Sequence, residues 1–444
     1  MNPKIIVLDD DPTGSQTVHA CLLLTRWDVA TLKTALADAA PLFFVLTNTR
    51  GMDATRAAAV TREVCDNLKA ALADYAGTVL FVSRSDSTLR GHYPVETDVM
   101  NDVLGPFDAT LLTPAFFEGG RVTRDGTHYL IVDGTPVPTH ETEFARDAVF
   151  GYTTAFLPDY VAEKTGGRVA SKDVARLTLA DLRAGKADAW LASLAHNAVG
   201  AVDGDTPDDY RVFADAVLNA AAGGKRLLFR SAASLLTALA RLPPQPVAAE
   251  AFATLVRGGR PGAIIVGSHV ARTTAQLTAL LKERGVIGLP LDVTRLPAER
   301  VAVVDQLSAS IAHAHAQGLT PVVFTSRAEL QFASAAERLA FGEVVSVTLM
   351  DVVKRLPATL GFLISKGGIT SNDVLSTGLE LTASRVLGQI LPGVTVVQTP
   401  PGHRLPQLPV VIFPGNVGGD GALAEAYRRL APSHASASPA TLVA

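Results

Sequence analysis

The chain has 444 residues, of which 48% are hydrophobic, and a formal net charge of −4. This length exceeds what one hydrophobic core serves and this composition excludes a disordered protein, so we expect two or three globular domains. The near balance of 39 basic and 43 acidic residues creates no overall field that attracts nucleic acid or anionic membranes, so neither is an expected partner.

The cysteines and the N-terminal segment predict the compartment. Cys21 and Cys65 lack metal-ligand spacing, and two cysteines in a chain of this length are typical of a reducing cytosol. Residues 1–4 lead directly into an apolar run without the apolar region of a signal peptide, and no apolar run reaches membrane-spanning length. We therefore expect a soluble cytoplasmic protein.

The first predicted strand ends in three acids. Residues 5–8 are branched and apolar, which is typical of a buried parallel strand, and Asp9, Asp10 and Asp11 follow directly. Adjacent carboxylates repel one another, whereas ligands bind at the carboxyl ends of parallel strands. We interpret this turn as functional, because its acids could hold a metal, bind sugar hydroxyls or accept a proton. The alternative is a solvated turn with a local Asp cap.

Strands and helices alternate through the rest of the first half. Apolar runs predict further strands over residues 20–24, 42–46, 78–82, 110–112, 201–205 and 226–230. Helical spacing predicts helices over residues 29–40 and 53–74. This alternation predicts an α/β fold with a doubly wound parallel sheet, and the glycine-rich residues 118–138 predict a hairpin.

Two more strand ends in this half carry polar side chains. Arg50 follows one strand, and the turn after the next strand contains Arg84, Ser85, Asp86 and Ser87. An arginine fork matches a carboxylate, and Asp with Ser suits sugar hydroxyls. Together with Asp10 and Asp11, these residues predict a pocket for a small polyhydroxylated acid. The alternative for residues 83–92 is a capped helix start with surface arginines.

Residues 241–262 contain four prolines and three glycines and predict a domain boundary. We expect an N-terminal domain over residues 1–245, a C-terminal domain over 260–432, and a disordered Ala-, Ser- and Pro-rich tail over 433–444. Strands in the second half are predicted over residues 263–266, 288–292, 321–325, 361–364 and 410–413. A helix is predicted from about residue 371 to about residue 387.

Glycine-rich turns follow three of these strands, at residues 267–268, 365–371 and 415–419. In the middle turn, glycines allow close approach of the backbone to an anion, Thr370 or Ser371 would cap the next helix, and Lys366 could add a point charge. None of the turns matches a Walker A or Rossmann fingerprint, so a plain turn is the alternative for each. The histidines lack metal-ligand spacing, and no metal ligand is assigned.

Taken together, these turns resemble the four-carbon acid sugar kinase family from about residue 4 to about residue 430. In the first half the resemblance rests on Asp10-Asp11-Pro12-Thr13-Gly14, Asn48-Thr49-Arg50 and Asp86-Ser87-Thr88-Leu89-Arg90-Gly91. In the second half it rests on Gly267-Ser268, Gly367-Gly368-Ile369-Thr370-Ser371 and Pro414-Gly415-Asn416-Val417-Gly418. The chain differs from the family at three places: Ile369 replaces a usual Glu, Phe413 replaces a Lys, and Ser83 with Arg84 replaces Lys-Lys.

The resemblance implies an ATP-dependent kinase that phosphorylates the terminal hydroxyl of threonate, erythronate or an oxo-tetronate, with Mg²⁺ on the ATP phosphates. It implies that the N-terminal domain holds the acid sugar, that the C-terminal domain holds ATP, and that the active site lies in the cleft between them. The implied substrate residues are Asp10, Asp11, Arg50, Arg84, Ser85, Asp86 and Ser87, with Asp10 or Asp11 as the catalytic base. The implied ATP residues are Ser268, Gly367, Gly368, Ile369, Thr370, Gly415, Asn416, Val417 and Gly418.

Two other classes of function stay open. One is an NAD-dependent dehydrogenase or a lyase of a small hydroxy acid, although no strand is followed by a proper dinucleotide fingerprint. The other is a non-enzymatic ligand-sensing or effector protein, which would have little use for intact acids at Asp10, Asp11 and Asp86. The expected partners are the acid sugar, ATP and ADP, and a homodimer is left open.

Overall fold

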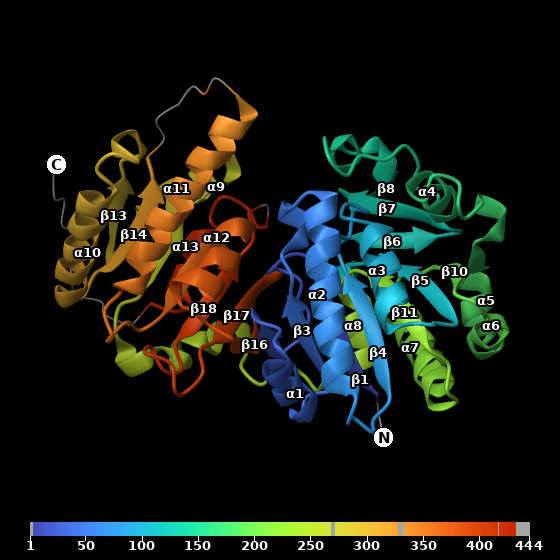
Figure 1. The fold of residues 1–444 in the computed structure, drawn as a ribbon. Helices are drawn as coiled ribbons and strands as arrows, with labels where there is room; N and C mark the ends of the chain where they lie inside the picture. Colours follow the sequence, from blue (N-terminus) through green and yellow to red (C-terminus); the bar gives the residue numbers. More distant parts are fainter. Residues whose placement is uncertain (1–2, 268–270, 327–331, 333, 416, 432–444) are drawn as a thin grey trace. The chain divides into compact units, whose positions relative to one another are not determined.

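The computed structural model describes residues 3–267, 271–326, 332, 334–415 and 417–431 (Figure 1). The chain forms two compact units, Met1–Pro244 and Gln245–Ala444. Each unit contains a mostly parallel sheet flanked by helices, so the predicted two-domain α/β fold is confirmed. The tail predicted over residues 433–444 lies outside the described residues.

The N-terminal unit is built on a sheet with the strand order β2-β3-β1-β4-β11-β5-β10-β9. Its strands are β1 (Lys4–Asp9), β2 (Leu22–Leu24), β3 (Leu42–Leu46), β4 (Val79–Arg84), β5 (Ala109–Thr113), β9 (Ala175–Leu177), β10 (Ala198–Val202) and β11 (Leu227–Ser231). Every pairing within this set is parallel. All carboxyl ends therefore lie at one edge of the sheet. The sequence missed β9 and placed β10 three residues too late.

The central strands of this sheet are buried on both faces, as their continuous apolar sequences predict. One group of neighbouring helices is α1 (Val29–Ala37), α2 (Ala54–Leu72) and α3 (Val95–Leu104). A second group is α5 (Leu179–Arg183), α6 (Ala187–Ser193), α7 (Pro207–Ala222) and α8 (Ala233–Ala240). Helix α2 begins where the Asp53 carboxylate accepts the Arg56 N–H at 2.9 Å. Helix α7 begins with a capping box between Thr206 and Asp209.

A small antiparallel sheet follows β5, and it confirms the predicted hairpin. Its strands are β6 (Arg121–Arg124), β7 (Thr127–Val132) and β8 (Thr135–Pro138). Asp125 and Gly126 join β6 to β7 with positive φ angles of 50° and 78°. Two residues with positive φ form the hairpin turn whose twist matches that of the strands, which is why Asp-Gly stands here. Helix α4 (Leu157–Lys164) follows this sheet.

The C-terminal unit has a sheet with the strand order β13-β14-β12-β15-β18-β17-β16. Its strands are β12 (Ala263–Val266), β13 (Val286–Leu291), β14 (Thr320–Thr325), β15 (Leu363–Lys366), β16 (Ala383–Leu391), β17 (Val394–Gln398) and β18 (Pro409–Phe413). The first five strands in this order are parallel, and β17 is antiparallel to both of its neighbours. The helices are α9 (Ala271–Leu280), α10 (Arg300–Ala316), α11 (Ala335–Lys354), α12 (Gly368–Asp373) and α13 (Ala422–Arg428).

The helix predicted to reach about residue 387 is wrong. Helix α12 ends at Asp373, a π-helical turn covers Val374–Gly378, and the chain then forms the β16–β17 hairpin. Burial alternates along most of β16 with the period of two that a strand requires. Gly393, with a φ of 75°, lies in the turn between the strands. Pairing of β17 with β18 fixes this hairpin, and local helical spacing does not show that contact.

Candidate functional site

The carboxyl ends of β3, β1, β4 and β11 bring most of the predicted substrate residues together. The sheet register pairs Asp9 with Arg84 and Arg84 with Ser231. The Arg50 N–H donates to the Asp10 carbonyl at 3.2 Å, which joins the turn after β3 to the turn after β1. Strand-end positions in the sequence therefore become neighbours at one edge of the sheet.

Arg50 lies among three of the predicted acids. Its Nη2 is 2.5 Å from Asp10 Oδ1, while its Nη1 is 3.5 Å from Asp11 Oδ2 and 3.9 Å from Asp86 Oδ1. Burial by itself would lower the pKa of Arg50, but the three carboxylates outweigh burial and raise it. Arg50 is thus a permanent cation that holds three carboxylates in one cluster.

Asp10 is the best-fixed member of this carboxylate cluster. It is buried, and its Oδ2 accepts hydrogen bonds from Ser85 Oγ at 2.5 Å and from Arg50 Nε at 3.2 Å. Arg84 Nη1 lies 3.9 Å from Asp10 Oδ1 and 3.3 Å from Asp9 Oδ1. Of the two predicted arginines, Arg84 is therefore buried and paired with buried acids, whereas the side chain of Arg50 is partly exposed.

Asp9 is a member of the cluster that was not assigned from the sequence. It is fully buried, its Oδ2 has no hydrogen-bond partner, and burial raises its pKa to about 7 although Arg84 opposes this shift. A Cβ on Gly14 would lie 1.9 Å from that oxygen, so only glycine fits there. In the sequence, Asp9 is the first acid of the Asp-Asp-Asp run. It is the last residue of the buried strand β1, and its side chain is therefore shielded from solvent.

Asp11 and Asp86 are the more exposed acids of the cluster. Asp11 is 21% exposed and accepts the Thr13 N–H at 2.9 Å. Asp86 is 13% exposed and accepts from Arg90 Nε at 2.8 Å. Burial would raise both pKa values, but the neighbouring arginines and hydrogen bonds lower them. Both side chains therefore carry negative charge at neutral pH.

A buried ion pair that sequence reasoning missed lies beside the cluster. Arg230 Nη1 is 2.5 Å from Glu96 Oε2 and donates to Ser83 Oγ at 2.7 Å. Gly91 allows this packing, because a Cβ there would lie 2.7 Å from Arg230 Nη2 and 2.3 Å from Ser85 Oγ. Arg230 ends the predicted strand 226–230, so the strand-end reasoning applied to the other turns could have found it.

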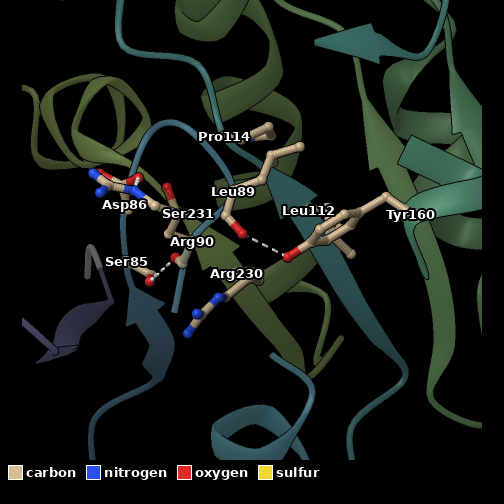
Figure 2. Close-up of a pocket in the computed structure, with 9 residues that line it drawn as sticks. All are labelled: Ser85, Asp86, Leu89, Arg90, Leu112, Pro114, Tyr160, Arg230 and Ser231. Atoms are coloured by element: carbon tan, nitrogen blue, oxygen red, sulfur yellow. Dashed lines mark hydrogen bonds and ion pairs between the residues drawn. The ribbon is translucent and has the colours of Figure 1, made fainter. Parts of the chain in front are cut away.

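A pocket opens between these strand ends, with an empty volume of about 290 Å³ that includes open solvent. Figure 2 shows Ser85, Asp86 and Arg90 on one side of it and Tyr160 on the other. The remaining lining residues are Leu89, Leu112, Pro114, Arg230 and Ser231. Ser87 is not among the lining residues, and its carbonyl accepts a hydrogen bond from His128 Nε2 at 2.8 Å. Burial lowers the pKa of His128 to about 4, so this imidazole is neutral.

The three glycine-rich turns of the C-terminal unit also meet, because β12, β15 and β18 are adjacent. Val266 pairs with Lys366, and Lys366 pairs with Phe413. A Cβ on Gly267 would lie 2.3 Å from Thr370 Oγ1, which shows how closely the first two turns approach. Gln276 of α9 donates from Nε2 to the carbonyls of residues 417, 418 and 419, at 3.0, 3.3 and 3.0 Å.

Two details of the middle turn differ from the prediction. Lys366 is fully buried, and its Nζ donates to the carbonyls of Pro414 at 2.5 Å and Gly415 at 3.0 Å. Because of these two hydrogen bonds, the amino group stabilises the third turn and does not point to solvent. Burial also lowers the pKa of Lys366 to about 8. The predicted cap at Thr370 or Ser371 is also wrong, since Gly367, with a φ of 112°, stands at the N-cap.

The remaining predicted nucleotide residues lie around this junction. Ile369 is 69% exposed, and Gly418 has a positive φ of 77°. A Cβ on Gly415 or Gly419 would meet no atom within 4 Å, so open space lies beside these glycines. Ser268 and Asn416 lie outside the described residues. This open, glycine-rich edge fits a phosphate-bearing ligand.

In the part of the chain that the structure describes, no group of three His, Cys, Asp or Glu side chains could hold a metal ion. Cys21 and Cys65 are both buried. No helix among the described residues has the length and apolarity to cross a membrane.

Two relatives of known name resemble part of the chain. A D-erythronate kinase of Heliobacterium modesticaldum is 32% identical over 167 residues, and a D-threonate kinase of Bordetella bronchiseptica is 33% identical over 164 residues. The first match covers 36% of each chain, and the second covers 35% of this chain and 38% of the relative. The matched part of this chain therefore spans little more than a third of either relative.

Two solved structures share the fold over nearly the whole chain. A Salmonella typhimurium protein provisionally named a tRNA synthase matches 96% of this chain and 98% of its own, with a TM-score of 0.67 and 18% identity. A Haemophilus influenzae protein from a domain family of unknown function matches 96% of this chain and 100% of its own, with a TM-score of 0.63 and 18% identity.

Family models account for both units. Residues 5–239 match a model described as a sugar-binding N-terminal domain, and residues 263–423 match one described as a nucleotide-binding C-terminal domain. The first model alone spans more than half of the chain. The chain belongs to the four-carbon acid sugar kinase family that these two domains define.

Proposed function

We propose that the chain is an ATP-dependent kinase that phosphorylates the terminal hydroxyl of a four-carbon sugar acid such as threonate, erythronate or an oxo-tetronate. The observation that carries this proposal is the arginine–carboxylate cluster around Arg50, which places charged groups and the Ser85 hydroxyl at one edge of the sheet, where a small polar acid can bind. The names of the two kinase relatives support it. We place the acid sugar on the N-terminal domain and ATP on the C-terminal domain.

The acid sugar would contact the groups that face the pocket and the cluster. Asp86 and Ser85 can bind sugar hydroxyls, and Ser87 lies in the same turn. Arg50 would bind the substrate while Arg84 keeps Asp9 and Asp10 in place. Asp11, the most exposed of the acids that Arg50 contacts, is the proposed acceptor of the proton from the attacking hydroxyl. Asp10 is fixed by Arg50 and Ser85, so we assign it to positioning and hydroxyl binding.

ATP would lie against the three glycine-rich turns, where a Cβ on Gly415 or Gly419 would meet no atom within 4 Å. Mg²⁺ bound to ATP would neutralise charge on the transferred phosphoryl group, and positioning would supply most of the remaining catalysis. Lys366 and Gln276 hold the third turn in shape by donating to its carbonyls. Transfer of the phosphoryl group requires the two bound substrates to meet in line.

A cytoplasmic location of the chain stays a prediction, and whether it forms a homodimer stays open.

The test is a kinase assay on the full chain with ATP, Mg²⁺ and a panel of D- and L-threonate, D- and L-erythronate and their oxo forms. We expect formation of ADP that depends on one or more of these acids, with phosphate on the terminal hydroxyl of the product. Reduction of NAD by the same acids without ADP formation would favour the dehydrogenase instead. Saturation of the wild-type chain by an acid with neither reaction would favour a ligand-sensing protein.

A further inference from the structure

The two predicted substrate arginines, Arg50 and Arg84, and the two arginines that line the pocket, Arg90 and Arg230, each already have a carboxylate partner. Arg50 lies 2.5 Å from Asp10, Arg84 lies 3.3 Å from Asp9, Arg90 lies 2.8 Å from Asp86, and Arg230 lies 2.5 Å from Glu96. A sugar acid would bring one more carboxylate to this site. Because a buried charge is costly unless it is paired, that carboxylate needs a cation that the cluster does not already use.

Arg121, the first residue of β6, forms no ion pair with any carboxylate of the described residues. Its Nη1 donates to the Gly119 carbonyl, and its guanidinium lies 6.0 Å from the centre of the Phe116 ring. Its Nε is buried and has no hydrogen-bond partner. Burial lowers the pKa of Arg121, as expected for a cation that lacks a paired anion. Arg121 therefore keeps donors and charge for a ligand.

The face of the β6–β7 hairpin that carries Arg121 is the face that contacts the turn after β4. Thr123 and His128 are paired across this hairpin, and the Thr123 hydroxyl donates to His128 Nδ1 at 2.9 Å. His128 Nε2 lies 2.8 Å from the carbonyl of Ser87. Arg121 is two residues before Thr123, so its side chain leaves the same face of the strand.

The backbone of Arg121 is also fixed to the segment that leaves β5. Its N–H donates to the Phe116 carbonyl at 2.9 Å, and its carbonyl accepts the Phe116 N–H at 2.9 Å. That segment begins at Pro114, which lines the pocket in Figure 2. The charges of Asp86 and Arg90, two other lining residues, act on Arg121. Arg121 does not itself line the pocket; it is related to the pocket through its pairing with Phe116 and through the charges of these two lining residues.

We propose that Arg121 binds the carboxylate of the acid sugar and thereby selects acids over neutral sugars. The inference deepens the proposed function and rests on it for the class of substrate. Arg50 would then serve the reacting end of the substrate and its hydroxyls, since its fork is occupied by Asp10. The planar guanidinium of Arg121 can bind a carboxylate through two parallel hydrogen bonds, which a lysine cannot reproduce.

The test uses calorimetric titration of the full chain with threonate and erythronate and with their neutral amides, in the absence of ATP. The variants are Arg121→Gln and Arg121→Lys, and Arg124→Gln is the matched control. Arg124 lies on the opposite face of the same strand and is paired with Asp205 at 2.7 Å. The melting temperature of each variant shows whether it folds.

We expect Arg121→Gln to weaken binding of the acid by about tenfold or more while binding of the amide changes little, because only the acid loses a charged hydrogen bond. Arg121→Lys should fall between this variant and the wild type, and Arg124→Gln should bind like the wild type. Folded Arg121→Gln that binds the acid as tightly as the wild type would overturn the proposal. Arg121-dependent binding without any phosphoryl transfer would support this inference and remove the proposed kinase function.

Discussion

The two units place different chemistry on the same part of an α/β sheet. At the strand ends of the N-terminal unit, arginines and carboxylates pair with one another, and their side chains form the candidate site. At the strand ends of the C-terminal unit, glycines dominate, and the buried side chains of Lys366 and Gln276 donate to loop carbonyls. The candidate site of the first unit is thus formed by charged side chains, whereas that of the second unit is formed mainly by backbone atoms.

Because the two edges differ in this way, they should tolerate different substitutions. A cluster of paired charges depends on every member, because removing one partner leaves its counter-ion buried and unpaired. A glycine-rich turn depends on the absence of side chains, since its backbone must approach a ligand closely. In the N-terminal unit, loss of a charged side chain should therefore impair the candidate site, whereas in the C-terminal unit the addition of a side chain at a glycine should impair it.

The largest effect should come from the proposed proton acceptor in the N-terminal unit. Asp11→Asn should lower kcat by roughly a hundredfold or more, the usual size of a general-base effect, while ATP still binds. Asp10→Asn should mainly raise the KM of the acid, because Asp10 is held by Arg50 and Ser85. Steady-state kinetics with saturating ATP measure both. Near wild-type kcat in both variants would remove both acids from catalysis and leave them only a structural role as partners of Arg50.

A smaller effect is expected in the C-terminal unit, where an added side chain should interfere. Gly368→Asp should weaken ATP binding by about tenfold or more, because a side chain and a negative charge would both oppose the phosphates. Binding of the acid sugar should not change, and this gives the experiment its internal control. Isothermal titration measures both affinities. Unchanged ATP affinity would remove the middle turn from the nucleotide site.

The sequence predicted those parts of the site that are local. Asp10, Asp11, Arg50 and Arg84 each end or closely follow an apolar strand, so their positions required only the topology of a parallel sheet. Arg230 itself ends a predicted strand, but its partner Glu96 is 134 positions away in the chain, so no local pattern indicates the ion pair. Arg121 was missed for the same reason, since its place depends on how the β6–β7 hairpin contacts the turn at Ser87.

The fold shows the same limit. Continuous apolar runs identified the central strands of both sheets, because such strands are buried on both faces. The β16–β17 hairpin was predicted as helix, since its residues also allow helical spacing and its true partner, β18, is distant in the chain until the sheet forms. The secondary structure of this segment is therefore determined by pairing between strands and not by local preference.

The buried titrating groups of the two units should affect stability with opposite signs. Asp9 has a pKa of about 7 in the folded chain against 3.8 for an ordinary Asp. Between about pH 4 and pH 7 the folded state keeps a proton that the unfolded state has lost, so stability should fall as pH rises through this window. The slope cannot exceed about 1.4 kcal/mol per pH unit for one proton. Denaturant unfolding of the wild type and Asp9→Asn measures it, and equal slopes would contradict the assignment.

Lys366 should act over a narrower window and in the other direction. Its pKa is about 8 in the folded chain against 10.5 for an ordinary Lys. Between about pH 8 and pH 10.5 the unfolded state holds a proton that the folded state has lost, so stability should rise with pH, again by less than about 1.4 kcal/mol per pH unit. Lys366→Met should remove this rise and leave the Asp9-dependent fall at lower pH intact. If Lys366→Met flattened the acidic window instead, the two strand-end sites would not be electrostatically separate, and the contrast between a charged edge and a backbone edge would be lost.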